Sequence, residues 1–188
     1  MRRVVLMVVA LAVLAGPVFA QTPDGGPISA SLKRVWDGVK RNVQESAEKM
    51  PADGYGFRPA GVAPEVMSFG QILAHVATSN MSYCGRAKGE AADVMQANSK
   101  RFGDLEKTGT RDEIIKAVGE SIAYCDGVYG FMTDAKLAET ISMGQNQIAR
   151  AFFLVQNVSH DNEHYGNLVT YFRAKGMVPP STERTQKR

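Results

Sequence analysis

Apolar side chains recur at helical spacing through most of the chain, beginning in the segment from about Ile28 to Met50. Five apolar residues there fall three or four positions apart, so one face of a helix would be apolar and the other charged. They are Ile28, Leu32, Val35, Val39 and Val43. The following stretch, Pro51–Pro64, is rich in glycine and proline and is expected to be a loop.

Two further helices begin at sequence signals for capping. Ser68 and Gln71 form a capping box, in which two side chains bond the free amides at a helix start. A helix is therefore expected from Ser68 to about Arg86. Thr110 precedes an acidic first turn and predicts a third helix that ends near Met132.

The fourth predicted helix runs from about Gln145 to Lys175 and is the longest. Gly176 is expected to supply its C-cap, and the Pro179–Pro180 pair to prevent further helix. No segment alternates apolar and polar residues over the length of a strand. The pattern therefore predicts an all-α protein, a four-helix bundle.

The chain begins with a pattern typical of a secretory signal peptide. Arg2 and Arg3 are followed by an apolar run to Ala15 and by a Val-Phe-Ala sequence ending at Ala20. The run is shorter than the ~20 apolar residues that span a bilayer, which disfavours the alternative of a membrane anchor. We expect residues 1–20 to be removed and the protein to be periplasmic or secreted.

After the signal peptide, the sequence predicts a single domain. We expect a flexible leader at 21–27, the bundle at 28–180 and a polar tail at 181–188. Cleavage would lower the net charge from +3 to +1, because it removes two arginines and no acidic residue. The mature chain thus gives no electrostatic reason to bind nucleic acid or anionic lipid.

The loop between the second and third predicted helices, Ala87–Gly109, is too long for a simple turn. It can run the height of the bundle, which would make the two helices parallel and the bundle up-down-down-up. Cys84 and Cys125 follow the two capping residues at nearly equal distances in sequence, so parallel helices would place them at one height. An oxidising compartment then favours a disulfide, with two buried free thiols as the alternative.

The histidines carry the main chemical signal. His160 and His164 are four residues apart, so both project from one face of the fourth helix and can reach a shared ion. The same arc has no charged residue, whereas Asp161 and Glu163 point elsewhere by helical phase. The arc consists of Phe153, Asn157, His160, His164, Asn167 and Tyr171. We interpret it as a polar pocket inside the bundle.

His75 on the second helix is the only other histidine. Alone, it would more often be a core or surface residue, but beside the pair it is the natural third ligand. Neutral imidazoles suit zinc, the default divalent metal here, with nickel, copper or iron(II) as alternatives. Three protein ligands leave a coordination position open, as in catalytic sites. Asn157, Asn167, Tyr171 and Thr78 are candidates for orienting a substrate or the ligands.

Four motifs follow one another in a characteristic order. They are PADGYGFRP at 51–59, SFGQILAHVA at 68–77, HDNEHYGNL at 160–168 and GMVPP at 176–180. Together they resemble the DinB superfamily, also called DinB/YfiT-like metalloenzymes. The resemblance implies an up-down-down-up bundle and a divalent metal held by His75, His160 and His164. Related families include bacillithiol-dependent transferases and mycothiol-dependent maleylpyruvate isomerase, whose metal is thought to activate a low-molecular-weight thiol.

Two main classes of function fit these features. The first is an exported metal-dependent transferase or hydrolase of a small molecule, for which the sequence identifies no catalytic acid or base. The second is a non-catalytic protein that binds metal or a small ligand, and a structural bundle with core histidines is a third. Bundles of this type often pair through exposed helix faces, so a homodimer is a further expectation. Contact with nucleic acid, or with a membrane after cleavage, is not expected.

Overall fold

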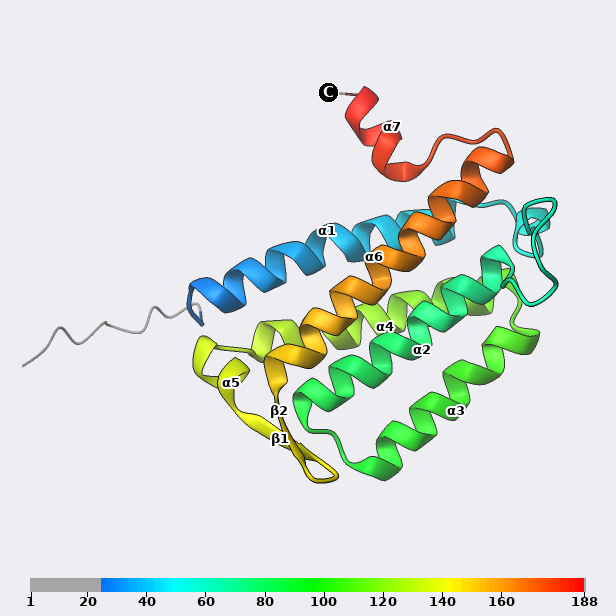
Figure 1. The fold of residues 1–188 in the computed structure, drawn as a ribbon. Coiled ribbons are helices and arrows are strands. Elements are labelled where there is room, and N and C mark those ends of the chain that lie inside the picture. Colours follow the sequence, from blue (N-terminus) through cyan, green and yellow to red (C-terminus); the bar gives the residue numbers. More distant parts are fainter. Residues whose placement is uncertain (1–24, 188) are drawn as a thin grey trace, which may run out of the picture.

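Four long helices form an up-down-down-up bundle in the computed structural model, which describes residues 25–187 (Figure 1). The long helices are α1 (Pro27–Lys49), α2 (Phe69–Lys88), α4 (Arg111–Phe131) and α6 (Arg150–Ala174). The shorter elements are the 3-10 turn η1 (Ala52–Gly54), α3 (Ala92–Thr108), α5 (Asp134–Ala138), β1 (Thr140–Met143), β2 (Asn146–Ala149) and α7 (Pro180–Gln186). The expected signal peptide, residues 1–20, lies outside the described residues. Between residues 25 and 187, no helix combines the length and apolar composition needed to cross a bilayer.

A disulfide joins α2 and α4 and shows that the two helices are parallel. Cys84 and Cys125 are bridged, with their Cα atoms 5.5 Å apart. Four residues earlier on each helix, the amide of Asn80 donates to the hydroxyl of Ser121. Because residue numbers rise together along the two helices, the connection between them must return to the end where α2 began.

The other neighbouring pairs give the rest of the topology. Arg150 at the start of α6 donates to the carbonyl of Ala87 near the end of α2, so these helices are antiparallel. Arg111 at the start of α4 donates to the carbonyl of Glu48 near the end of α1, so these are antiparallel as well. The first and last long helices therefore run one way, and the middle two run the other.

Large apolar side chains fill the centre of the bundle. Trp36 of α1 is fully buried, and its ring stacks on Tyr129 of α4 with the centroids 5.0 Å apart. Phe69 at the start of α2 meets Phe172 of α6 edge to face at 5.3 Å. Aromatic pairs of this kind contribute about 0.5–1.5 kcal/mol beyond the burial of their area. They tie together helices that are distant in sequence.

The segment 87–109, predicted to be a loop, contains helix α3. This helix packs along α2 on the outside of the four-helix bundle (Figure 1). Phe102 is its one buried residue, and most of its other side chains are exposed or half-buried. An apolar stripe this narrow gives a weak periodic signal, which explains why the sequence pattern did not predict the helix.

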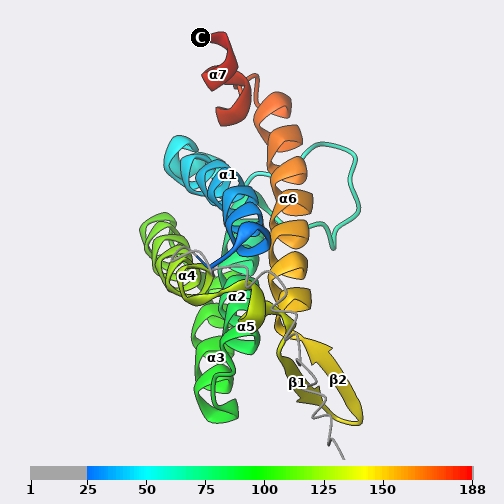
Figure 2. The same cartoon turned by 90° about the vertical axis from the view of Figure 1, so that its left-hand side faces the viewer.

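Residues 140–149 form a β-hairpin, whereas the sequence pattern predicted helix from Gln145 onward. The two strands pair antiparallel and project from one end of the bundle (Figure 2). Gly144 between them has φ +61°, a conformation that favours glycine in a tight hairpin turn. Strands of four residues are too short to show a clear alternation in the sequence, which explains why the hairpin was not predicted. Because the hairpin occupies these residues, α6 begins at Arg150 and not at Gln145.

The C-terminal segment 181–188 was predicted to be a polar tail, but its residues 181–186 belong to helix α7, which contacts α1. The Pro179–Pro180 pair was expected to prevent further helix. Pro180 instead occupies the first turn of α7, where its fixed φ favours the start of a helix. Glu183 of α7 forms an ion pair with Lys49 of α1. The ammonium of Lys49 is the main reason that the pKa of Glu183 is lowered to about 2.

The leader expected at 21–27 is ordered where the structure describes it. Pro27 begins α1, and the carbonyl of Gly25 accepts a hydrogen bond of 2.7 Å from the amide of Asp134. The Asp134 carboxylate in turn accepts the amide of Ser29 at 2.8 Å, which lowers the pKa of Asp134. A carboxylate at the amino end of a helix is favourable because the free amides there carry partial positive charge.

We expect replacement of both Cys84 and Cys125 by alanine to lower the free energy of unfolding by about 2–4 kcal/mol. The disulfide joins residues separated by 41 positions, and it restricts the unfolded chain accordingly. Urea denaturation of the oxidised wild type and the double variant measures the difference. Reducing agent should destabilise the wild type and leave the variant unchanged. Equal stability of the two oxidised proteins would contradict this role for the disulfide.

Candidate metal centre

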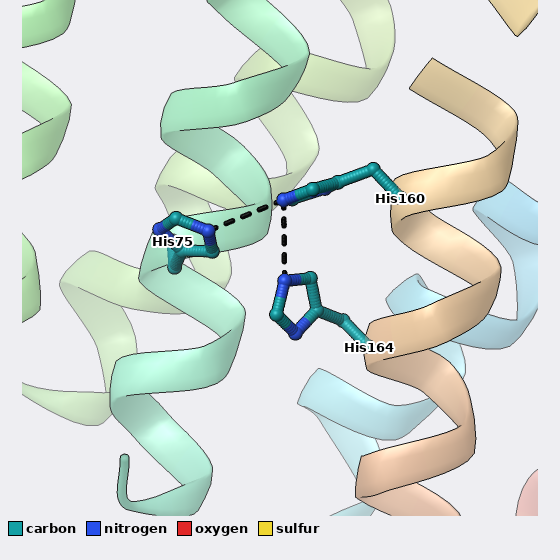
Figure 3. A group of neighbouring side chains, drawn as sticks. All are labelled: His75, His160 and His164. Atoms are coloured by element: carbon teal, nitrogen blue, oxygen red, sulfur yellow. Dashed lines mark hydrogen bonds between the residues drawn. The ribbon is translucent and has the colours of Figure 1, made fainter. Parts of the chain in front are cut away.

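The three histidines of the sequence meet between α2 and α6 (Figure 3). His160 Nε2 lies 3.2 Å from His75 Nε2 and 3.2 Å from His164 Nε2. One ligand nitrogen of each ring lies within 4.8 Å of the other two. Three imidazoles from two helices therefore point at one position.

Local helix geometry accounts for this convergence. The predicted capping box is present at the start of α2, where the amide of Ser68 donates to the side chain of Gln71 at 2.9 Å. This box fixes where α2 begins, and His75 projects from its second turn toward α6. On the antiparallel α6, His160 and His164 are one turn apart and share a face. The ring of His75 thus comes from α2, and the rings of His160 and His164 come from α6, across the contact between these two helices.

The spacing of the nitrogens fits a divalent ion. Two nitrogens that bind one zinc ion tetrahedrally at ~2.0–2.1 Å are about 3.3–3.4 Å apart. The separations of 3.2 Å around His160 Nε2 are close to that value. A neutral imidazole has one N–H, so three Nε2 atoms that face one another cannot all be well paired by hydrogen bonds alone. A cation would use all three lone pairs.

Carboxylates lie behind two of the three rings. Glu106 Oε1, from α3, is 3.5 Å from His75 Nδ1, and Asp161 Oδ1 is 3.5 Å from His160 Nδ1. A carboxylate near Nδ1 favours the tautomer with the proton on that atom and leaves the Nε2 lone pair for a metal. Metal-binding histidines usually have such a partner. The surroundings of His75 and His160 therefore match those of metal ligands.

Asp161 departs from the helical-phase argument, which directed it away from the site. It is fully buried, and neither carboxylate oxygen has a hydrogen-bond partner among the described residues. Burial raises the pKa of this carboxyl to about 6, and the neighbouring His160 opposes the shift. An unpaired buried carboxylate is costly. Its place beside His160 indicates a role in the site, whereas Glu163 is exposed as the phase predicts.

His164 is the most enclosed of the three histidines, at 8% exposure. Burial is the main reason that its pKa is lowered to about 4, and the nearby His160 and His75 contribute to this shift. The ring is therefore neutral at pH 7 and keeps a lone pair for a metal. Its Nδ1 is buried and has no hydrogen-bond partner within residues 25–187.

Asn157, predicted to line the pocket, belongs to a buried polar network next to the disulfide. Its amide nitrogen donates to Asn80 Oδ1 at 2.5 Å, and its oxygen accepts from the hydroxyl of Tyr129 at 3.0 Å. The same oxygen is 3.7 Å from Cys84 Sγ. The side chain therefore connects α6 to α2 and α4, and its polar groups are engaged there.

The other three residues predicted for the pocket have different surroundings. The hydroxyl of Tyr171 donates to the backbone carbonyl of Met67 at 2.6 Å and so holds the residue that precedes the cap of α2 against α6. The hydroxyl of Thr78 donates to the carbonyl of Ala74 within α2 at 3.0 Å. Asn167 is exposed. The uncharged arc of α6 thus mixes core, site and surface positions.

Glu106 was not among the residues predicted for the site, because it lies on α3, a helix that the sequence pattern did not predict. The signal available for α3 was the apolar spacing of Met95, Phe102 and Leu105, which places them near one face of a helix. That spacing could have predicted the helix that carries Glu106. The contact of Glu106 with His75 depends on how α3 packs against α2, and the spacing of apolar residues does not give that packing.

Solved structures with similar folds come from several proteins. A DinB-like protein from Bacillus cereus ATCC 10987 is 15% identical with a TM-score of 0.61, over 80% of this chain and 95% of that one. The mycothiol-dependent maleylpyruvate isomerase is 13% identical with a TM-score of 0.56, over 76% and 61%. The colibactin self-resistance protein ClbS, solved with double-stranded DNA, is 12% identical with a TM-score of 0.57, over 77% and 95%. These likenesses show a shared fold.

No curated protein gives a significant match to the sequence. The family model described as the DinB superfamily matches residues 36–168. The match extends from the buried Trp36 of α1 to Leu168 of α6, and it includes all three histidines. The expected family is thereby confirmed, and the chain belongs to the DinB superfamily.

Proposed function

We propose that this protein is an exported metalloprotein that holds one divalent ion through His75, His160 and His164. An open coordination position on that ion would serve a transfer or hydrolysis reaction on a small molecule. The convergence of three Nε2 atoms at the spacing of metal ligands carries this proposal. The carboxylates behind His75 and His160 support it.

The donor set suits a metal of borderline softness. Three neutral imidazoles are typical ligands of zinc, which we propose, and also bind nickel or iron(II). A bound ion would supply Lewis acidity at the open position. The chain's own part is to present Nε2 lone pairs, which the buried and neutral His164 does at pH 7.

Access from solvent favours chemistry on a ligand over a closed structural site. The side chain of His75 is 33% exposed and that of His160 is 17% exposed. A pocket of about 220 Å³ lies between the end of α3, the start of α2 and the preceding loop; Glu106 lines it, whereas none of the three histidines does. Arg58 and Gln71 also line it, so it offers polar contacts to a small molecule.

A second candidate is a protein that binds metal or a small ligand without chemistry. It is favoured by the positions of the two carboxylates, which face Nδ1 atoms and not the position where the three Nε2 atoms meet. Neither is thus placed as a general base. Assays of the metal-loaded protein on ester, amide, phosphoester and thiol-adduct panels separate the candidates, since turnover supports the first and inertness across all four supports the second.

We also propose that the protein is exported and that its partners are small molecules. The Cys84–Cys125 disulfide supports an oxidising compartment and hence export, where a cytoplasmic thiol cofactor would be scarce. We propose small molecules as partners and not nucleic acid, because the net charge after cleavage is near zero. The DNA complex is a property of ClbS, whose likeness to this chain is one of fold. Pairing into a homodimer stays a prediction.

Protein purified without a His tag and reconstituted with zinc is expected to hold one equivalent of metal by elemental analysis. Each of the variants His75→Ala, His160→Ala and His164→Ala should retain far less, because two imidazoles hold an ion much more weakly than three. Asn167→Ala is the matched control, since it changes an exposed residue of α6. Wild type without stoichiometric metal, or His75→Ala with full occupancy, would show that the site is wrong.

Glu106→Gln is expected to weaken zinc binding about 10–100-fold, the usual effect of removing a carboxylate behind a ligating histidine. Competition with a chromophoric chelator measures the dissociation constant. Glu163→Gln serves as control, because it removes the same charge from an exposed position beside His164. If both variants lost affinity equally, the effect would be one of general charge and not of contact with His75.

A further inference from the structure

A hydroxyl lies next to one of the three histidines. Ser79 Oγ is 3.4 Å from His160 Nε2. The same nitrogen lies 3.2 Å from His75 Nε2 and 3.2 Å from His164 Nε2. His160 Nε2 is therefore surrounded by two imidazole nitrogens and one serine oxygen.

The position of Ser79 on α2 accounts for this contact. It follows His75 by one helical turn, so both residues face α6. The neighbouring hydroxyl of Thr78 donates to the backbone of its own helix, a common arrangement for this residue type. The Ser79 hydroxyl faces His160 on the other helix. Two adjacent hydroxyls of α2 therefore have different surroundings, and that of Ser79 is directed at the site.

The distance defines what Ser79 can do there. Ser79 Oγ lies 3.4 Å from His160 Nε2, the nitrogen that also lies 3.2 Å from each of the other two imidazole nitrogens, so the hydroxyl borders the histidine cluster. A neutral alcohol is not among the usual ligands of zinc, which are thiolate, imidazole and carboxylate. It is, however, both a donor and an acceptor of hydrogen bonds. The hydroxyl therefore suits contact with a ligand of the ion better than contact with the ion.

Tyr83 holds the geometry on the same side. It lies one further turn along α2, and its ring meets the His160 ring edge to face with centroids 5.7 Å apart. The ring of His160 is thus bounded by Tyr83 on α2 and by His164 on its own helix, at 4.4 Å between centroids. A ring fixed in this way keeps its Nε2 beside Ser79, as a preorganised site requires.

We propose that Ser79 is the positioning residue of the metal centre, whose hydroxyl hydrogen-bonds the water molecule or substrate atom at the open position. The proposal rests on the proposed function, because it needs an ion held by the three histidines. It goes further by naming a protein group that contacts the atom bound at the open position, which sequence spacing alone did not reveal. The hydroxyl orients the incoming atom, and the metal affinity itself stays with the imidazoles.

The test uses the full-length mature protein loaded with cobalt(II), with azide as the probe of the open position. Azide binding is followed by the change in the visible absorption spectrum of cobalt. In Ser79→Ala, azide affinity is expected to fall about three- to tenfold, the effect of losing one hydrogen bond. Cobalt affinity should stay within about twofold of wild type. Ser82→Ala, a half-buried serine of the same helix, is the matched control and should bind azide like wild type.

Each outcome is decisive. Wild type that fails to bind cobalt contradicts the proposed function itself. Wild type that binds cobalt while Ser79→Ala keeps full azide affinity contradicts only the role of Ser79. A loss of cobalt affinity of more than about tenfold in Ser79→Ala also overturns the proposal, because the serine would then act as a metal ligand. Equal weakening of azide in Ser79→Ala and Ser82→Ala contradicts it as a nonspecific effect on α2.

Discussion

The enclosure of α2 by three other helices is the constraint on which both the fold and the site depend. α2 packs against α3, α4 and α6, and each contact fixes a different side of it. Cys84 is bonded covalently to α4, His75 lies between Glu106 of α3 and the histidines of α6, and Asn80 bonds to both α4 and α6. Rotation of α2 about its axis would break all of these contacts together. The position of His75 is therefore set by the whole bundle, as a preorganised site requires.

The same enclosure concentrates polar groups where the bundle would otherwise be apolar. Asp161 is fully buried without a hydrogen-bond partner in the described part of the chain, and the Nδ1 atoms of His160 and His164 are in the same condition. Groups left in this state destabilise a fold by an amount comparable to a lost hydrogen bond or more. A cation at the three Nε2 atoms would draw the imidazole protons to Nδ1 and pair the Asp161 carboxylate with His160. Binding of such a cation would therefore be coupled to the stability of the fold through these side chains.

The sequence predicted those features that depend on local chemistry. The caps at Ser68 and Thr110 are present with both of their reciprocal bonds, and Gly176 adopts φ +70° at the end of α6. The family and the bundle followed from motif order and helical period.

Other features depend on packing between distant segments. Helix α3 buries only Phe102, so its period is faint, and the strands of the hairpin are too short to show theirs. Helical phase directed Asp161 away from the site, and it could not show that the buried carboxylate lies 3.5 Å from His160 Nδ1.

The disulfide has a consequence for the continuity of the chain. Between Cys84 and Cys125 lie the end of α2, all of α3 and the first two-thirds of α4. A protease that cuts the exposed stretch around α3 would open the backbone but leave both fragments joined through sulfur, since exposed connections are the usual sites of such nicks. The helices that carry the histidines would stay in one covalent molecule. The chain can therefore be severed beside its own site and still migrate as a single species until it is reduced.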